Sequence, residues 1–208
     1  MLIEILLKAG WISVSTFAAL MLVRYTRQSI NPHIPVTFSP SQQYLSEVGG
    51  STSASRPYFV AWGLAYALLA SVSFAILLKP LHPVALVLPF LLLALFSVGF
   101  IAPLDEQPII HNAAILGGIG TVGLCIYAAA VALGSSPGNL AFAVTVLLSA
   151  GMYLSFELTQ LDEGARSLGV DPQHLNGPPL QKLFLSVVFV SQFWLIYQVG
   201  AKNWGGDM

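Results

Sequence analysis

The chain has 208 residues, of which 56% are hydrophobic and only 8% are charged, whereas a soluble domain usually has about 25% charged residues. So few charges would not keep apolar helices in solution, which excludes an ordinary soluble globular domain. The formal net charge of −1 and the lack of a Lys/Arg run give no electrostatic basis for binding nucleic acid or for a polybasic lipid patch.

Long hydrophobic runs dominate the sequence. Several reach about 20 residues, the length that spans the hydrocarbon core of a bilayer. Since backbone polar groups in lipid must be satisfied within the segment, runs of this length are expected to be helical. The sequence therefore predicts an all-α polytopic transmembrane helix bundle, one domain over residues 1–208. Its expected spans are 2–23, 58–78, 84–101, 112–133, 140–161 and 180–199.

The first hydrophobic run is interpreted as an uncleaved span. A signal peptide has basic residues first, then a short apolar core, then a small-residue cleavage site. Here Glu4 and Lys8 lie inside the apolar run, and Arg24 and Arg27 follow it. Glu4 and Lys8 are four residues apart, so they share a helix face on which their charges neutralise one another.

The connections between the spans differ strongly in polarity. Loops two and four, at 79–83 and 134–139, are short, nearly uncharged and rich in the proline and glycine that end helices. Six spans place both termini on one side of the membrane and loops one, three and five (24–57, 102–111 and 162–179) on the other. These three loops carry nearly all the ionisable groups of the chain. These loops carry slightly more Lys and Arg residues than the connections on the other side of the membrane, which favours a cytosolic position for them.

Polar residues on this side form the candidate site. Acidic groups in loop three precede the fourth span, where a helix N-terminus favours negative charge, and His111 is expected at or just before that N-terminus. A carboxylate–imidazole cluster here is compatible with binding a lipid headgroup, holding a metal or shuttling a proton; the simpler alternative is helix capping and loop tethering. The candidate cluster is Ser46, Glu47, Gly49, Asp105, Glu106, His111, Asn112, Glu157 and His174.

Two of these candidates also have simple structural interpretations. Glu157, in the last turns of the fifth span, is interpreted as an interfacial carboxylate that pairs with Lys182. His174 is interpreted as a loop residue.

Several kinds of site are not indicated. Residues 118–123 match the G-x-G-x-x-G dinucleotide fingerprint, but they lie inside an expected span, with no preceding strand and no acidic residue about 20 positions later. We interpret these small residues as a helix-packing surface. The four histidines form no metal-ligand spacing, and no G-x-S-x-G element indicates a serine hydrolase. No cofactor and no metal is expected.

Two short segments resemble the damage-regulated autophagy modulator family (DRAM/FRAG/SFK), which includes a bacterial branch of unknown function. One is Ser46-Glu47-Val48-Gly49, similar to an Ile/Leu-Ser-Asp/Glu-x-Gly element in the first loop; the other leads from Asp105 to His111 at the fourth span. Val48 stands where leucine is usual, and residues 171–179 have no counterpart. The resemblance implies six spans and a role in lipid organisation, trafficking or regulation. It also implies cytosolic termini and a lumenal or extracellular first loop, which is the opposite orientation to the one that the count of basic residues favours.

Three functional hypotheses follow. The first is a non-enzymatic multi-pass membrane protein whose polar loop face engages lipid headgroups or a partner protein. The second is an intramembrane lipid-modifying enzyme that uses His111 with Asp105 or Glu47 as acid and base. The third is an accessory subunit of a larger membrane complex. Expected partners are membrane lipids and, under the third hypothesis, other membrane-protein subunits. Transport is not favoured, since no broken-helix pair or central charge is present.

Overall fold

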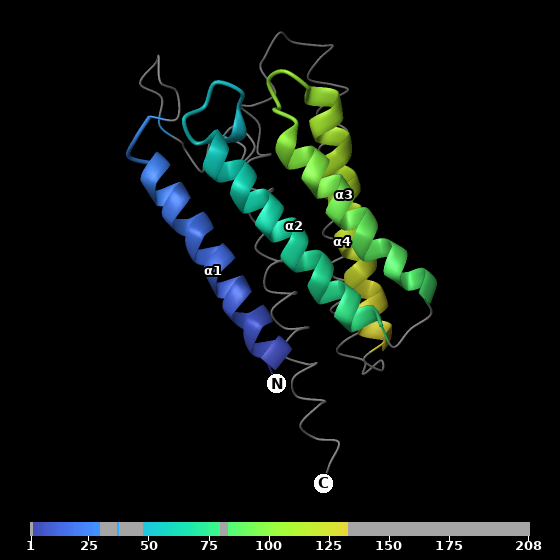
Figure 1. Cartoon of the computed structure of the whole chain (residues 1–208). Coiled ribbons are helices and arrows are strands. Elements are labelled where there is room, and N and C mark those ends of the chain that lie inside the picture. The colour runs from blue at the N-terminus through green and yellow to red at the C-terminus, as the bar shows by residue number, and fades with distance from the viewer. Residues whose placement is uncertain (1, 30–36, 38–47, 80–82, 133–208) are drawn as a thin grey trace.

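The computed structural model describes residues 2–29, 37, 48–79 and 83–132 of the chain. This part is helical, with an isolated bridge between Ser29 and Thr37 and no strand among the described residues (Figure 1). The helices are α1 (Leu2–Tyr25), α2 (Arg56–Leu78), the short 3-10 helix η2 (Pro83–Leu86), α3 (Val87–Ile101) and α4 (Pro108–Ala132).

Four of these helices are long and apolar enough to cross a membrane. They correspond to the first four expected spans, so the prediction of an all-α fold is confirmed for the described residues. The expected spans at 140–161 and 180–199 lie outside the described residues, as do the candidate residues Ser46, Glu47, Glu157 and His174.

The helix boundaries correct the sequence-based ones at several points. α2 begins at Arg56 rather than at position 58, and α4 begins at Pro108 rather than at position 112. Both helices have a proline in their first turn, where the missing N–H would have no helical acceptor in any case. His111 was expected at or just before the helix N-terminus, but it lies within the first turn of α4. The loop before it is correspondingly shorter than predicted.

The third span also begins and ends for local reasons. Residues 83–86 form a 3-10 turn, and the α-helix starts only at Val87. At the other end, Ala102 is extended with φ −72° and ψ 117°. Pro103 follows it, and the residue before a proline is disfavoured in the α conformation. This proline therefore stops α3 and turns the chain toward α4.

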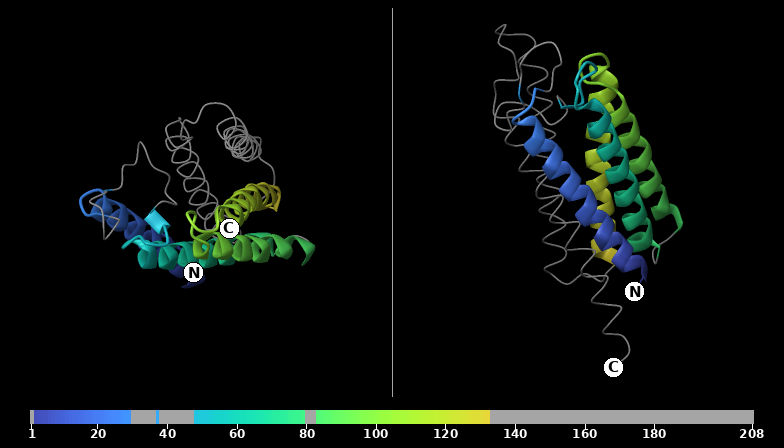
Figure 2. Two further views of the ribbon diagram at one scale, coloured as in Figure 1. Left: turned by 90° about the horizontal axis from the view of Figure 1, so that it is seen from above. Right: turned by 60° about the vertical axis from the view of Figure 1, so that its left-hand side comes forward.

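The described helices form a bundle organised around α2. α2 contacts α1 on one side and packs against both α3 and α4, which also contact each other. The two views in Figure 2 show α1 running along α2, away from α3 and α4. Much of α1 is exposed, with large apolar side chains at Ile5, Leu6, Ile12, Leu20 and Val23. In a bilayer such a face is covered by lipid or by other spans.

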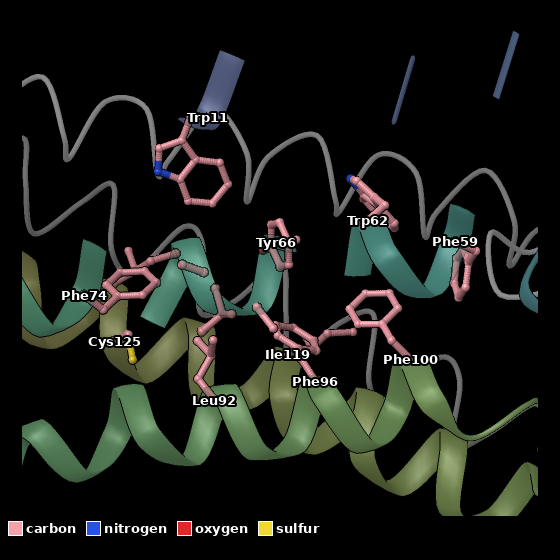
Figure 3. Close-up of a cluster of buried hydrophobic side chains, with 14 of the residues drawn as sticks. Trp11, Phe59, Trp62, Tyr66, Phe74, Leu92, Phe96, Phe100, Ile119 and Cys125 are labelled. Atoms are coloured by element: carbon pink, nitrogen blue, oxygen red, sulfur yellow. The ribbon is translucent and has the colours of Figure 1, made fainter. Parts of the chain in front are cut away.

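Aromatic rings of α2 and α3 form a large part of the core, together with aliphatic side chains of α3 and α4 (Figure 3). Phe100 contacts Phe59 and Trp62 edge-on, with ring centroids 5.4 and 5.5 Å apart, and Phe96 contacts Tyr66 in the same way at 5.6 Å. Edge-to-face pairs place the positive edge of one ring against the negative face of the next. These contacts fix the relative positions of α2 and α3.

Small residues allow this close packing. A Cβ atom on Gly118 would lie 2.7 Å from the ring of Phe96, and one on Gly99 would lie 2.6 Å from Cδ1 of Ile115. A Cβ atom on Gly63 would run into the ring of Phe100. Residues 118–123 lie within α4, as expected for a helix-packing surface. Gly120 is an exception, because none of the described residues lies within 4 Å of its Cβ position.

Candidate functional site

Polar groups gather at the end of the bundle where α1 and α3 end and α2 and α4 begin (Figure 1). Residues 48–55, the end of loop one, meet the α3–α4 loop there, so the two loops lie on the same side of the bundle as predicted. We call the linked side chains at this end the polar cap, which comprises Ser51, Ser55, Arg56, Asp105 and His111.

Asp105 and Ser51 join the two loops directly. The backbone N–H of Ser51 donates to Oδ1 and Oδ2 of Asp105 at 2.9 and 3.1 Å, and the Ser51 hydroxyl donates to Oδ2 at 2.7 Å. An ionised carboxylate accepts such bonds more strongly than a neutral group does. The pair therefore ties residue 51 to the loop that leads into α4.

These hydrogen bonds also stabilise the ionised form of Asp105. Partial burial alone would raise the pKa of its carboxyl group, but the bonds from Ser51 and the nearby charge of Arg56 outweigh that effect. The pKa of Asp105 is lowered below its ordinary value of 3.8. Asp105 is thus an anion near neutral pH and accepts hydrogen bonds rather than donating a proton.

Arg56 forms a second tie between the same segments. Its Nη1 donates to the carbonyl oxygen of Gly49 at 2.7 Å, and its Nη2 donates to the carbonyl oxygen of Ile101 at 2.7 Å. Ile101 is the last residue of α3, and carbonyls at a helix C-terminus have no partner within the helix. The planar guanidinium reaches both acceptors at once because its donors diverge in a fixed geometry.

Ser55, next to Arg56, holds the entry into α2. It is fully buried, and its hydroxyl donates to the carbonyl oxygen of Val48 at 2.5 Å while lying 2.6 Å from the hydroxyl of Ser53. The Tyr25 hydroxyl, at the end of α1, donates to the carbonyl oxygen of Ala54 at 3.3 Å. Loop residues 48–55 are therefore bonded to the end of α1 and the start of α2, and through Ser51 to the α3–α4 loop.

His111, like Ser55, is a buried member of the polar cap. Its side chain is 4% exposed, and its Nδ1 lies 2.8 Å from the carbonyl oxygen of Ala102. A carbonyl oxygen only accepts hydrogen bonds, so Nδ1 carries the proton and donates it. The imidazole therefore links the first turn of α4 to the residue that ends α3. This contact requires His111 to lie inside the helix, where the structure places it.

The sequence-predicted residues fall into three groups. Gly49, Asp105 and His111 take part in the polar cap, Gly49 through its carbonyl oxygen and its close contact with Phe59. Glu106 is exposed and Asn112 is half-buried. The remaining four lie outside the described residues. Asp105 and His111 bind different partners, so the described bonds do not make them an acid–base pair.

Ser51, Ser55 and Arg56 were not predicted as site residues. A signal for Ser55 was present, because a serine just before a helix with proline in its first turn is typical of a helix start. Residues 51–55 read Ser-Thr-Ser-Ala-Ser, and Arg56-Pro57 follows. In the sequence, Arg56 is only one of several ionisable residues in loop one. Its role depends on the carbonyl of Ile101, which lies 45 residues later in the chain.

No three His, Cys, Asp or Glu side chains converge as metal ligands would in the part of the chain that the structure describes. Comparison with models of protein families, with curated proteins and with solved structures gave no match. Four apolar helices and a polar cap at one end define the class of this chain: by length and composition, they indicate an integral membrane protein built as a helix bundle.

Proposed function

We propose that this chain is a non-enzymatic, six-span membrane protein whose polar loop face engages lipid headgroups or a partner protein. The observation that carries the proposal is the tethering of loop one to the α3–α4 loop by Asp105 and to the end of α3 by Arg56. Two loops held in this way form a fixed polar surface at the end of the spans, at the depth where headgroups and the exposed loops of other membrane proteins meet the bundle.

The described contacts favour this function over an enzyme. General acid–base catalysis needs a proton donor and an acceptor aimed at a common reacting group. The described bonds of Asp105 come from Ser51, and the described bond of His111 goes to a backbone carbonyl, so neither is aimed at the other or at a common group. These bonds organise the loops. The resemblance to the damage-regulated autophagy modulator family supports the same kind of role, lipid organisation or regulation without a chemical step.

Hydrogen–deuterium exchange on the full-length protein in detergent tests the proposal. Adding phospholipid is expected to slow exchange in residues 48–55 and 102–107, with no change at residues 76–79 at the opposite end of α2. A co-purified membrane protein that protects the same loops would identify a protein partner instead of a lipid. Phospholipid turnover by the purified protein, or uniform exchange with and without lipid and partner, would overturn the proposal.

A further inference from the structure

The guanidinium of Arg24, at the end of α1, is contacted by two tyrosine rings and an amide. Arg24 is exposed and lies in the last turn of α1, and its Cζ is 5.5 Å from the ring centroids of both Tyr25 and Tyr58. Its Nε donates to Oε1 of Gln28 at 2.7 Å. A long arginine side chain normally moves freely in water. Here two rings and an amide contact the guanidinium.

The supporting rings are themselves fixed. Tyr25 is buried, 3% exposed, and its hydroxyl bonds to the loop at Ala54. Tyr58 is 41% exposed, so one ring anchors the arginine while the other borders the surface. The ring centroids of the two tyrosines are 6.5 Å apart. Arg24 thus lies over a pair of tyrosine rings, one from α1 and one from α2.

The bonds described for Arg24 use Nε alone, and none in the described part of the chain uses its two terminal nitrogens. Two parallel N–H groups on a planar guanidinium match two oxygens of a phosphate. Arg27, also exposed, adds a second positive charge one turn later. Arginine and tyrosine at the end of a span lie at headgroup depth. Below them, Leu20 and Val23 of α1 are exposed and apolar.

We infer that Arg24, held by Tyr25 and Tyr58, binds the phosphate of an anionic membrane phospholipid, whose acyl chain lies along the exposed face of α1. This inference rests on the proposed function and names its ligand class. It differs in location, because the arginine lies beside the polar cap and not within it. The two positive charges favour an anionic headgroup over a zwitterionic one, whose own cation would face Arg27.

Native mass spectrometry of the full-length protein in mild detergent tests the inference, with phosphatidylglycerol and phosphatidylcholine as probes. Wild-type protein should bind phosphatidylglycerol more tightly, and Arg24→Gln should weaken that binding about tenfold, the scale of a lost charge-assisted pair. Tyr58→Leu keeps the charge but removes one ring, so a smaller loss is expected. Lys79→Gln is the matched control, since it removes an exposed cation at the other end of α2 and should leave binding unchanged.

The outcomes separate this inference from the proposed function. Equal affinity of wild type and Arg24→Gln for phosphatidylglycerol would overturn the arginine site, while lipid-dependent protection of residues 48–55 would leave the proposed function standing. Equal binding of the two lipids would overturn the anionic preference. If Arg24→Gln does not fold, Tyr58→Leu decides, and unchanged binding by that variant counts against the site. Neither binding nor protection in the wild type would overturn both proposals.

Discussion

Ser51 and Asp105 are 54 residues apart in the chain, yet the backbone and the hydroxyl of Ser51 both donate to the Asp105 carboxylate. The pair joins the segment before α2 to the segment before α4. Both partners stand outside the helices, so the contact adds to the helix packing that brings the two loops together. Its strength is open to direct measurement.

The first prediction concerns that pair. Asp105→Ala is expected to lower the free energy of unfolding by about 1 kcal/mol, since the lost bonds are exposed to water and net hydrogen bonds of this kind are small. Ser51→Ala removes only the hydroxyl and should cost less. Thermal unfolding in detergent measures both changes, and the double variant should lose less than the two single losses added together. Strict additivity would show that the two groups do not interact.

The second prediction concerns pH. The pKa of Asp105 is lower in the folded chain than its ordinary value of 3.8, so the folded state favours the ionised form. Its stabilising effect is therefore present above about pH 4 and is lost as pH falls through the lower folded-state pKa. Asp105→Asn should remove this part of the acid dependence, whereas Glu106→Gln, at an exposed neighbour, should keep it. Unfolding curves for the three proteins from about pH 7 down to about pH 2 provide the comparison.

The third prediction concerns Arg56. Arg56→Lys keeps the charge but does not reproduce two diverging donors, so the carbonyls of Gly49 and Ile101 do not both keep their partner. A loss of about 1–3 kcal/mol is expected, the range for hydrogen bonds to charged groups. Arg27→Lys is the matched control at an exposed position and should be near neutral. Equal stability of the two variants would mean that the guanidinium bonds contribute nothing.

The fourth prediction compares two glycines of α4 that are two residues apart. Gly118→Ala places a methyl group against the ring of Phe96 and should destabilise the bundle by about 1–3 kcal/mol, as overpacking does. Gly120→Ala meets open space and should be neutral or stabilising by up to about 1 kcal/mol, because alanine favours the helix. Thermal unfolding of both variants distinguishes packing from helix propensity. A similar loss in both would point to the helix itself.

The fifth prediction concerns membrane sidedness. In a Cys125→Ser background, cysteines introduced at the exposed positions Thr52 and Glu106 should react with an impermeant thiol reagent from the same side of the membrane. A cysteine at Lys79, at the other end of α2, should react only from the opposite side. Labelling of sealed vesicles and of intact cells measures this. Opposite sidedness for positions 52 and 106 would contradict the polar cap.

The sequence by itself determined the class of fold in the described part. Runs of apolar residues long enough for a bilayer predict helices through backbone hydrogen bonding alone, and the structure has helices at all four such runs before residue 133. The gathering of loops one and three at one end follows from the parity of the spans and is confirmed by the Ser51–Asp105 contact. The helix starts at Arg56 and Pro108 were not predicted. Hydropathy locates apolar residues, but it does not show that a proline can stand in the first turn of a helix.

Only the tertiary structure decided what the polar residues do. Asp105 and His111 were predicted from residue type and position, but their partners are Ser51, 54 residues away, and the carbonyl of Ala102. In the sequence, Arg56 and Arg24 are both simply basic residues next to an apolar run. In the structure, Arg56 donates hydrogen bonds to two backbone carbonyls, whereas Arg24 lies over tyrosine rings from two helices. Hydrogen bonds and ring contacts of this kind depend on which helix ends meet. A local sequence pattern does not say which distant residues come together at those ends.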